Sequence, residues 1–115
     1  MQVQQLVEYA EGLYHDTTFS VCKEWKEKHG RAAIGYLPIY VPRELIDAAG
    51  MLPVGLLGGR GLVEIIRGDA FYQSYICQIP RSTVELALMG RYDFIDGFLF
   101  PSTCDVIRNL SGVWK

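Results

Sequence analysis

The sequence lacks the features that mark several large classes of protein. Its 115 residues contain no cluster of Lys and Arg and carry a formal charge of -2, which argues against a nucleic-acid-binding surface. It has no apolar run of about 18 residues to span a bilayer, and its first residues form neither the basic nor the apolar segment of a signal peptide. We therefore expect a cytoplasmic protein that binds neither nucleic acid nor membrane.

Cysteine is also scarce, because the chain has only three: Cys22, Cys77 and Cys104. An odd number of cysteines in a protein without an export signal fits a disulfide framework poorly. Free thiols or a metal site fit this composition better. Cys22 lies within an expected helix, where its ordinary interpretation is a small, buried or half-buried apolar residue.

What is present has the composition of one small domain with a core, because half of the residues are hydrophobic. Apolar residues recur at helical spacing from Val3 to about Lys28, which predicts two helices broken near residues 16–18. Short apolar runs then alternate with helical segments. The sequence thus predicts an α/β fold, with an N-terminal helical segment over residues 1–30 and an open parallel sheet, Rossmann-like or flavodoxin-like, over residues 31–115.

Three apolar runs are expected to form the strands of this sheet: Ala32–Leu37, Met51–Leu57 and Phe94–Phe100. Pro53 has no N–H to donate, so the second strand is expected at an edge of the sheet or at a bulge. Helices are expected after Pro42 and from near Ile79 to Gly90, each opened by a proline and stopped by a glycine.

The stretch between the second strand and the later helix carries weaker signals. Its glycines at positions 58, 59 and 61 match neither GxxxxGK[ST] nor GxGxxG in register, so we interpret them as a turn and not as a nucleotide-binding loop. Leu62–Arg67 is expected to be a short helix or strand. The aromatic run Ala70–Ile76 either packs against the domain or forms the wall of an aromatic ligand site.

The stretch from Asp93 to Asn109 carries the first candidate ligand. Its strand ends at Pro101, and Ser102 is expected to cap a helix that starts at Thr103, with Asp105 in the acidic position of a capping box. Cys104 then lies in the first helical turn. A thiolate there faces unpaired backbone N–H groups and the positive end of the helix dipole, which favour negative charge.

Cys77 is the second candidate, because it immediately precedes the helix expected near Ile79. If the strands are parallel, the loops that enter successive helices lie at one edge of the sheet, and Cys77 and Cys104 are expected to meet there. Their separation in sequence matches no metal-binding motif. On the residues alone, a shared metal and a pair of free thiols both stay open.

The sequence resembles the amino-terminal part of the benzoyl-CoA reductase and 2-hydroxyacyl-CoA dehydratase family in three runs: GYLPIYVPRELIDAAGMLPVGLLGG, DAFYQSYICQIPRS and YDFIDGFLFPSTCDVIRNLSGVWK. Within these, YVPRELIDAAGMLPVG and FPSTCDVIRNLSGVWK are most similar to the smaller cluster-bearing subunit of the ATP-dependent benzoyl-CoA reductases. The resemblance extends over the whole chain.

This resemblance implies a subunit that binds a [4Fe–4S] cluster through three cysteines, two of which correspond to Cys77 and Cys104. The third ligand is expected beyond Lys115, which makes the chain an amino-terminal fragment truncated within its α/β domain. Ser102 is expected either to cap a helix or to donate a hydrogen bond to a cluster sulfur. Arg81 and Arg108 are expected either to pair with CoA phosphates or to lie in solvent or in ion pairs with nearby carboxylates.

The resemblance also implies an oxidoreductase subunit that takes part in low-potential electron transfer to an aromatic CoA thioester, in anaerobic aromatic degradation. The expected partners are a homologous cluster-bearing subunit, ATP-hydrolysing iron–sulfur activator subunits and an aromatic acyl-CoA substrate. Two alternatives stay open: a subunit of a 2-hydroxyacyl-CoA dehydratase, and a non-catalytic interaction module that lacks a cluster. The isolated fragment is expected to be inactive.

Overall fold

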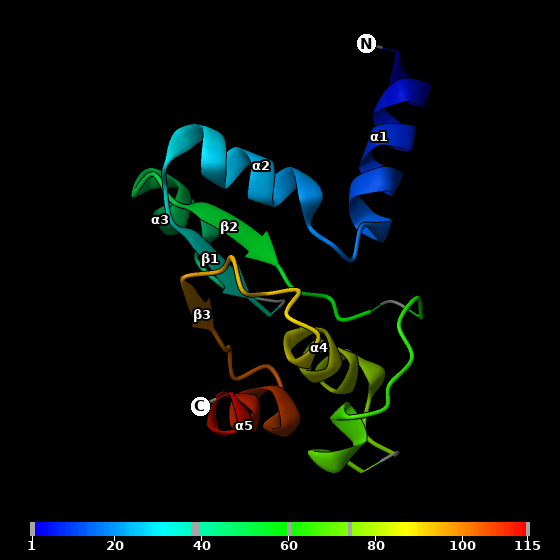
Figure 1. Ribbon diagram of the computed structural model, residues 1–115. Coiled ribbons are helices and arrows are strands. Elements are labelled where there is room, and N and C mark those ends of the chain that lie inside the picture. Colours follow the sequence, from blue (N-terminus) through cyan, green and yellow to red (C-terminus); the bar gives the residue numbers. More distant parts are fainter. Residues whose placement is uncertain (1, 38–39, 60, 74, 115) are drawn as a thin grey trace.

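Two N-terminal helices precede an alternation of strands and helices in the computed structural model (Figure 1). It describes residues 2–37, 40–59, 61–73 and 75–114; Pro38, Arg60 and Ser74, each within a segment interpreted above, lie outside the described residues. The elements are α1 (Val3–His15), α2 (Ser20–His29), β1 (Ala33–Tyr36), α3 (Arg43–Ala48), β2 (Leu52–Gly55), the 3₁₀ turn η1 (Gly68–Ala70), α4 (Gln78–Leu88), β3 (Gly97–Leu99) and α5 (Asp105–Val113).

The sheet is open and parallel, with the strand order β2-β1-β3. Ala33 lies opposite Leu52 and Ile34 lies opposite Gly97 in the two parallel ladders. The predicted α/β fold, with a parallel sheet after an N-terminal helical segment, is therefore confirmed. β2 is an edge strand, as Pro53 indicated, because an edge leaves room for a residue without an N–H.

The third strand is shorter than predicted, because β3 covers Gly97–Leu99 alone and Phe94 lies in a turn. Asp96 explains this limit. Its backbone N–H donates to the Ala33 carbonyl at 2.8 Å, while its carboxylate accepts the Ala33 N–H at 2.9 Å and the Lys26 ammonium at 2.8 Å. A side chain has thus replaced the ladder bond that a longer strand would make.

The core lies between the sheet and the helices that follow it. Its fully buried aliphatic side chains include Leu37 after β1, Leu56 after β2, Leu86 on α4 and Leu110 on α5. Burial of large aliphatic groups from all four segments gives the fold most of its stabilisation. In Figure 1, α4 and α5 lie below the sheet, where they pack against each other.

Helix α1 projects away from the sheet in Figure 1 and has no buried residue. It is amphipathic, and its exposed apolar side chains include Val3, Leu6, Val7 and Leu13. Among the described residues, no helix combines the length and apolar character needed to cross a membrane.

The turn between α1 and α2 is held by Asp16. Its carboxylate accepts the backbone N–H groups of Thr18 and Ser20, each at 2.9 Å, and both hydroxyls as well. These hydrogen bonds, led by those from the Ser20 and Thr18 hydroxyls, hold the pKa of Asp16 far below its usual range. The predicted break near residues 16–18 is confirmed, and Asp16 satisfies N–H groups at the start of α2.

We expect Asp16→Asn to lower the free energy of unfolding by about 0.5–1 kcal/mol at neutral pH, as for a partly exposed helix cap. Because the pKa is lowered in the folded state, the stabilisation is present above the unfolded pKa of about 3.9 and is lost as the pH falls through the folded value. Thermal unfolding at pH 7 and below pH 3 measures this loss. The exposed Glu24→Gln is the control, and an Asp16→Asn deficit that stays constant with pH would contradict the assignment.

Candidate functional site

Cys104 is the N-cap of α5. Its backbone is extended, with φ -153° and ψ 168°, and its Sγ accepts the Ile107 N–H at 3.5 Å. The predicted helix start at Thr103 with Ser102 as the cap is therefore wrong, because the helix begins at Asp105 and the sulfur takes the place of the cap oxygen. Asp105 pairs with Arg108 and makes no capping box. Ser102 is exposed in the loop that precedes Cys104.

Cys77 occupies the same position on α4. It is the N-cap residue, and its Sγ accepts the Ile79 N–H at 3.4 Å. The sequence correctly placed Cys77 just before this helix, which begins at Gln78. Both Cys77 and Cys104 are free and exposed, so each sulfur has a backbone N–H on one side and solvent on the other. Both sulfurs are therefore accessible to an external ligand.

The chain topology is consistent with the prediction that the two helix starts lie at one edge of the sheet. α5 follows β3 directly, so Cys104 lies where the strands end. α4 lies between β2 and the parallel strand β3 in the chain, as a crossover helix does, so its start is expected at the same edge. Carboxyl edges of open parallel sheets are where α/β proteins bind ligands.

Tyr72 lies in the connection that leads to α4 and contacts α5, and the sequence did not single it out. Its hydroxyl donates to the Val106 carbonyl in the first turn of α5 at 3.5 Å, and its ring packs against the core. Burial raises the pKa of Tyr72, and the negative charge of a Cys104 thiolate raises it further. The phenol is therefore within electrostatic reach of Cys104.

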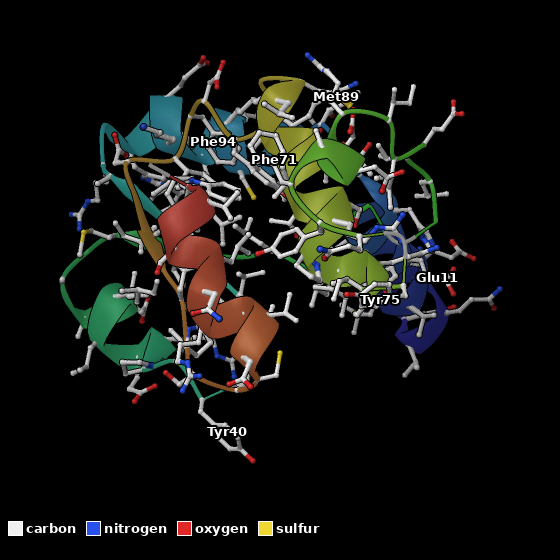
Figure 2. All side chains as sticks on the ribbon, turned by 90° about the horizontal axis from the view of Figure 1, so that it is seen from below. Glu11, Tyr40, Phe71, Tyr75, Met89 and Phe94 are labelled. Carbon is white, nitrogen blue, oxygen red and sulfur yellow. The ribbon has the colours of Figure 1, made fainter. Side chains whose placement is uncertain are left out.

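The other described aromatic residues of the segment differ in their surroundings. Phe71 borders a hollow of about 270 Å³ together with side chains of α4 and α5, including Val84 and Val113. Tyr75 is 81% exposed, and Figure 2 shows it on the periphery beside α4. The run thus combines Tyr72, which packs against the core, with two exposed rings, those of Phe71 and Tyr75.

The two candidate phosphate-binding arginines both take part in ion pairs. Arg81 Nη2 lies 2.7 Å from Asp69 Oδ1, and the arginine side chain is only 12% exposed. Arg108 pairs with Asp105 one turn away, and both of these side chains are largely exposed. The Arg81 guanidinium is therefore mostly buried in an ion pair within the protein, whereas Arg108 remains accessible to an anion.

The long connection from Leu56 to Cys77 is held by side chains of α4. Ser82 Oγ accepts the Gly59 N–H at 2.8 Å, and the buried Glu85 accepts the N–H groups of Ile66 and Gly68 at 3.1 and 2.6 Å. The helix or strand predicted for Leu62–Arg67 is wrong, because Glu85 satisfies this backbone in place of a ladder. The Gly59 N–H is occupied within the protein and faces no phosphate.

Cys22 has a different environment from the other two cysteines. It is half-buried on α2 and packs against the core, as its position in the helix indicated. Burial raises the pKa of its thiol, and the negative charge of Asp16 adds to this effect. Cys22 is thus poorly suited to act as a thiolate ligand.

The arrangement offers part of a metal-binding set. Within the described ranges, no three His, Cys, Asp or Glu side chains gather closely enough to hold a metal ion. Two exposed thiols at helix N-caps fit an iron–sulfur group by their chemistry, because such groups take thiolate ligands and carry negative charge. A further donor is needed to complete the site. A cavity of about 620 Å³ lies elsewhere, between α2 and the amino end of β1, and contains none of these cysteines.

Comparison with known proteins identifies relatives that are subunits of CoA-thioester reductases and dehydratases. The family described as "2-hydroxyglutaryl-CoA dehydratase, D-component" matches residues 38–115, which include both exposed cysteines. A benzoyl-CoA reductase subunit of Thauera aromatica is 59% identical over 116 residues, covering 100% of this chain and 30% of that protein.

Two dehydratase subunits are also similar. The (R)-phenyllactyl-CoA dehydratase beta subunit of Clostridium sporogenes is 39% identical over 77% of this chain and 23% of that protein. The (R)-2-hydroxyglutaryl-CoA dehydratase subunit beta of Acidaminococcus fermentans is 42% identical over 75% of this chain and 22% of that protein. The chain thus spans less than a third of the length of each of these relatives.

Proposed function

Because the chain belongs to the 2-hydroxyglutaryl-CoA dehydratase D-component family, we propose that it forms the amino-terminal part of an iron–sulfur subunit of a benzoyl-CoA reductase. The observation that carries this choice is the 59% identity to the Thauera aromatica benzoyl-CoA reductase subunit over the whole chain. The substrate is then an aromatic acyl-CoA thioester. The partners are a homologous cluster-bearing subunit and an ATP-hydrolysing electron donor.

Cys77 and Cys104 are the residues that would hold the [4Fe–4S] cluster. Their N-cap positions support this role, because the helix N–H groups at Ile79 and Ile107 stabilise negative charge on the sulfurs. When bound, a cluster supplies one-electron transfer at a low potential. We place the third thiolate in the part of the relatives' length that this chain does not span, since Cys22 is half-buried and its thiol pKa is raised.

The remaining residues of the site are proposed to shape its surroundings. Ser102 is exposed two residues before Cys104, from where its hydroxyl is free to turn toward a bound sulfur. Tyr72 donates its phenol O–H to the Val106 carbonyl in the first turn of α5. Arg108 is the accessible cation of the pair considered for CoA phosphates, although its present partner is Asp105.

A 2-hydroxyacyl-CoA dehydratase subunit is the second candidate. The two dehydratase subunits favour this candidate, because they are 39% and 42% identical to the chain over about three quarters of its length. Both candidates use the same pair of cysteines. They differ in the substrate, which is an aromatic ring in one case and a 2-hydroxyacyl group in the other.

Two chimeric subunits distinguish the candidates. Residues 1–115 replace the matching stretch of the Thauera aromatica subunit in one chimera and of the Acidaminococcus fermentans subunit in the other, each assembled with its native partners. We expect ATP-dependent benzoyl-CoA reduction by the first chimera within about tenfold of the unaltered complex, and at least a further tenfold loss of dehydration by the second. The reverse order would favour the dehydratase. Two iron-free, inactive chimeras would refute both.

A further inference from the structure

The segment that carries Cys77 into place has little regular structure of its own. Between β2 and α4 the described residues form only η1, and a connection of this length needs side-chain partners to hold its backbone. Figure 2 and the contacts between η1 and α4 place its second half against that helix. We call Gly68–Cys77 the ligand arm.

Arg81 holds the ligand arm at two points. Its Nε and Nη2 atoms donate to Asp69 Oδ1 at 3.1 and 2.7 Å, and its Nη1 donates to the Ile76 carbonyl at 3.4 Å. Ile76 immediately precedes Cys77. The guanidinium therefore joins the start of the arm to its end, and its planar fork allows both contacts at once.

Tyr72 connects the same arm to the other helix. Its hydroxyl bonds the carbonyl of Val106, two residues after Cys104, and its ring is anchored in the core. The arm thus contacts α4 beside Cys77 and α5 beside Cys104. Rigid placement of ligands before binding removes the entropy cost of ordering them later.

We propose that Arg81 and Tyr72 are positioning residues that hold the Cys77 and Cys104 thiols in one fixed arrangement before any cluster binds. The purpose of this arrangement rests on the proposed function. The arrangement itself is a property of the metal-free chain, so it is measured there. Cluster chemistry does not enter the measurement.

The experiment uses the metal-free 115-residue chain with Cys22→Ala, which leaves two thiols for nitroxide spin labels. Continuous-wave and pulsed dipolar spectroscopy then give the distance distribution between labels at Cys77 and Cys104. We expect one narrow distribution in this parent. Arg81→Gln and Asp69→Asn each remove half of the ion pair, and we expect each to widen the distribution at least twofold.

Tyr72→Phe removes a single oxygen atom and should shift or widen the distribution while far-ultraviolet circular dichroism stays unchanged. Arg108→Gln is the matched control, because it breaks an exposed pair on α5 and should leave the distribution as in the parent. Arg81→Lys restores the charge without the fork and should fall between the parent and Arg81→Gln. If Arg81→Gln unfolds the chain, the label distance distribution of Asp69→Asn decides whether the Arg81–Asp69 pair positions the thiols.

A parent distribution that is already broad, or one unchanged in both Asp69→Asn and Tyr72→Phe, overturns the proposal. An equally broad distribution in Arg108→Gln overturns the proposal as well, since it would show that the loss of any ion pair increases the mobility of the labelled segments. A narrow parent distribution that the variants widen, combined with iron-free chimeras, supports the positioning role while the proposed function fails. Iron-binding chimeras with a broad parent distribution support the proposed function while the positioning role fails.

Discussion

Replacing either Cys77 or Cys104 by alanine in the Thauera aromatica chimera is expected to abolish iron binding and reductase activity. Each change removes one of the proposed thiolate ligands. Changes to residues that merely support metal ligands already cost about 10–100-fold in affinity or activity, so loss of a ligand should cost more than about 100-fold. Iron and sulfide content and visible absorbance after anaerobic reconstitution measure the effect.

Cys22→Ala provides the matched control for this prediction. It makes the same chemical change at a half-buried thiol whose pKa is raised by burial. We expect iron content close to that of the unaltered chimera, with a small loss of stability from the missing contact with the core. A Cys104→Ala chimera that keeps its full iron content would show that Cys104 is not a ligand of the cluster.

Replacing Glu85 by alanine is expected to lower the free energy of unfolding by about 3–5 kcal/mol. The Glu85 side chain is 4% exposed and accepts the N–H groups of Ile66 and Gly68. Its removal leaves both donors without that partner, and a buried unsatisfied polar group costs about 1–3 kcal/mol. Arg67 adds little, because its Nε lies 3.7 Å away and its side chain is mostly exposed.

Urea unfolding followed by circular dichroism measures this loss, which is a large part of the stability of an ordinary small domain. Glu64→Ala is the control, because it removes an exposed glutamate from the same connection and should change stability by less than about 0.5 kcal/mol. Glu85→Gln keeps one acceptor oxygen and should fall between the two. Equal midpoints for Glu85→Ala and Glu64→Ala would show that the carboxylate does not anchor the connection.

The sequence predicted the sheet because its signals are local. Apolar runs separated by helical segments indicate parallel strands, and Pro53 limited β2 to an edge or a bulge, of which the structure has the edge. Cys77 was also placed correctly, since a residue three positions before Pro80 lies near a helix start. These inferences needed no knowledge of which distant residues meet.

The features that the sequence missed depend on distant or subtle contacts. Leu62–Arg67 has the composition of a short strand, but Glu85 on α4 accepts the backbone N–H groups of Ile66 and of Gly68 just after it, and nothing near residue 62 indicates this. The helix cap was misplaced for a different reason. Ser102 is the better cap by residue preference, whereas the chain turns two residues later, where the cap atom is a sulfur.

Tyr72 shows the same limit within the candidate site. The aromatic run was visible in the sequence, but its three described rings have different environments: Phe71 borders the hollow beside α4 and α5, Tyr72 bonds the first turn of α5, and Tyr75 is exposed. No periodicity in the run separates these roles. Only the packing of α4 against α5 assigns them.

The strand order also implies a sequence of events in folding. Ala33 pairs with Leu52 across the short α3 excursion, whereas Ile34 must find Gly97 across most of the remaining chain. Closing the longer loop costs more entropy and slows the search, so β1 and β2 are expected to associate before β3 joins them. Cys104 depends on β3 for its place. The start of α5 is therefore expected to be among the last parts of the molecule to form, and until then the Cys104 sulfur stays open to oxidants.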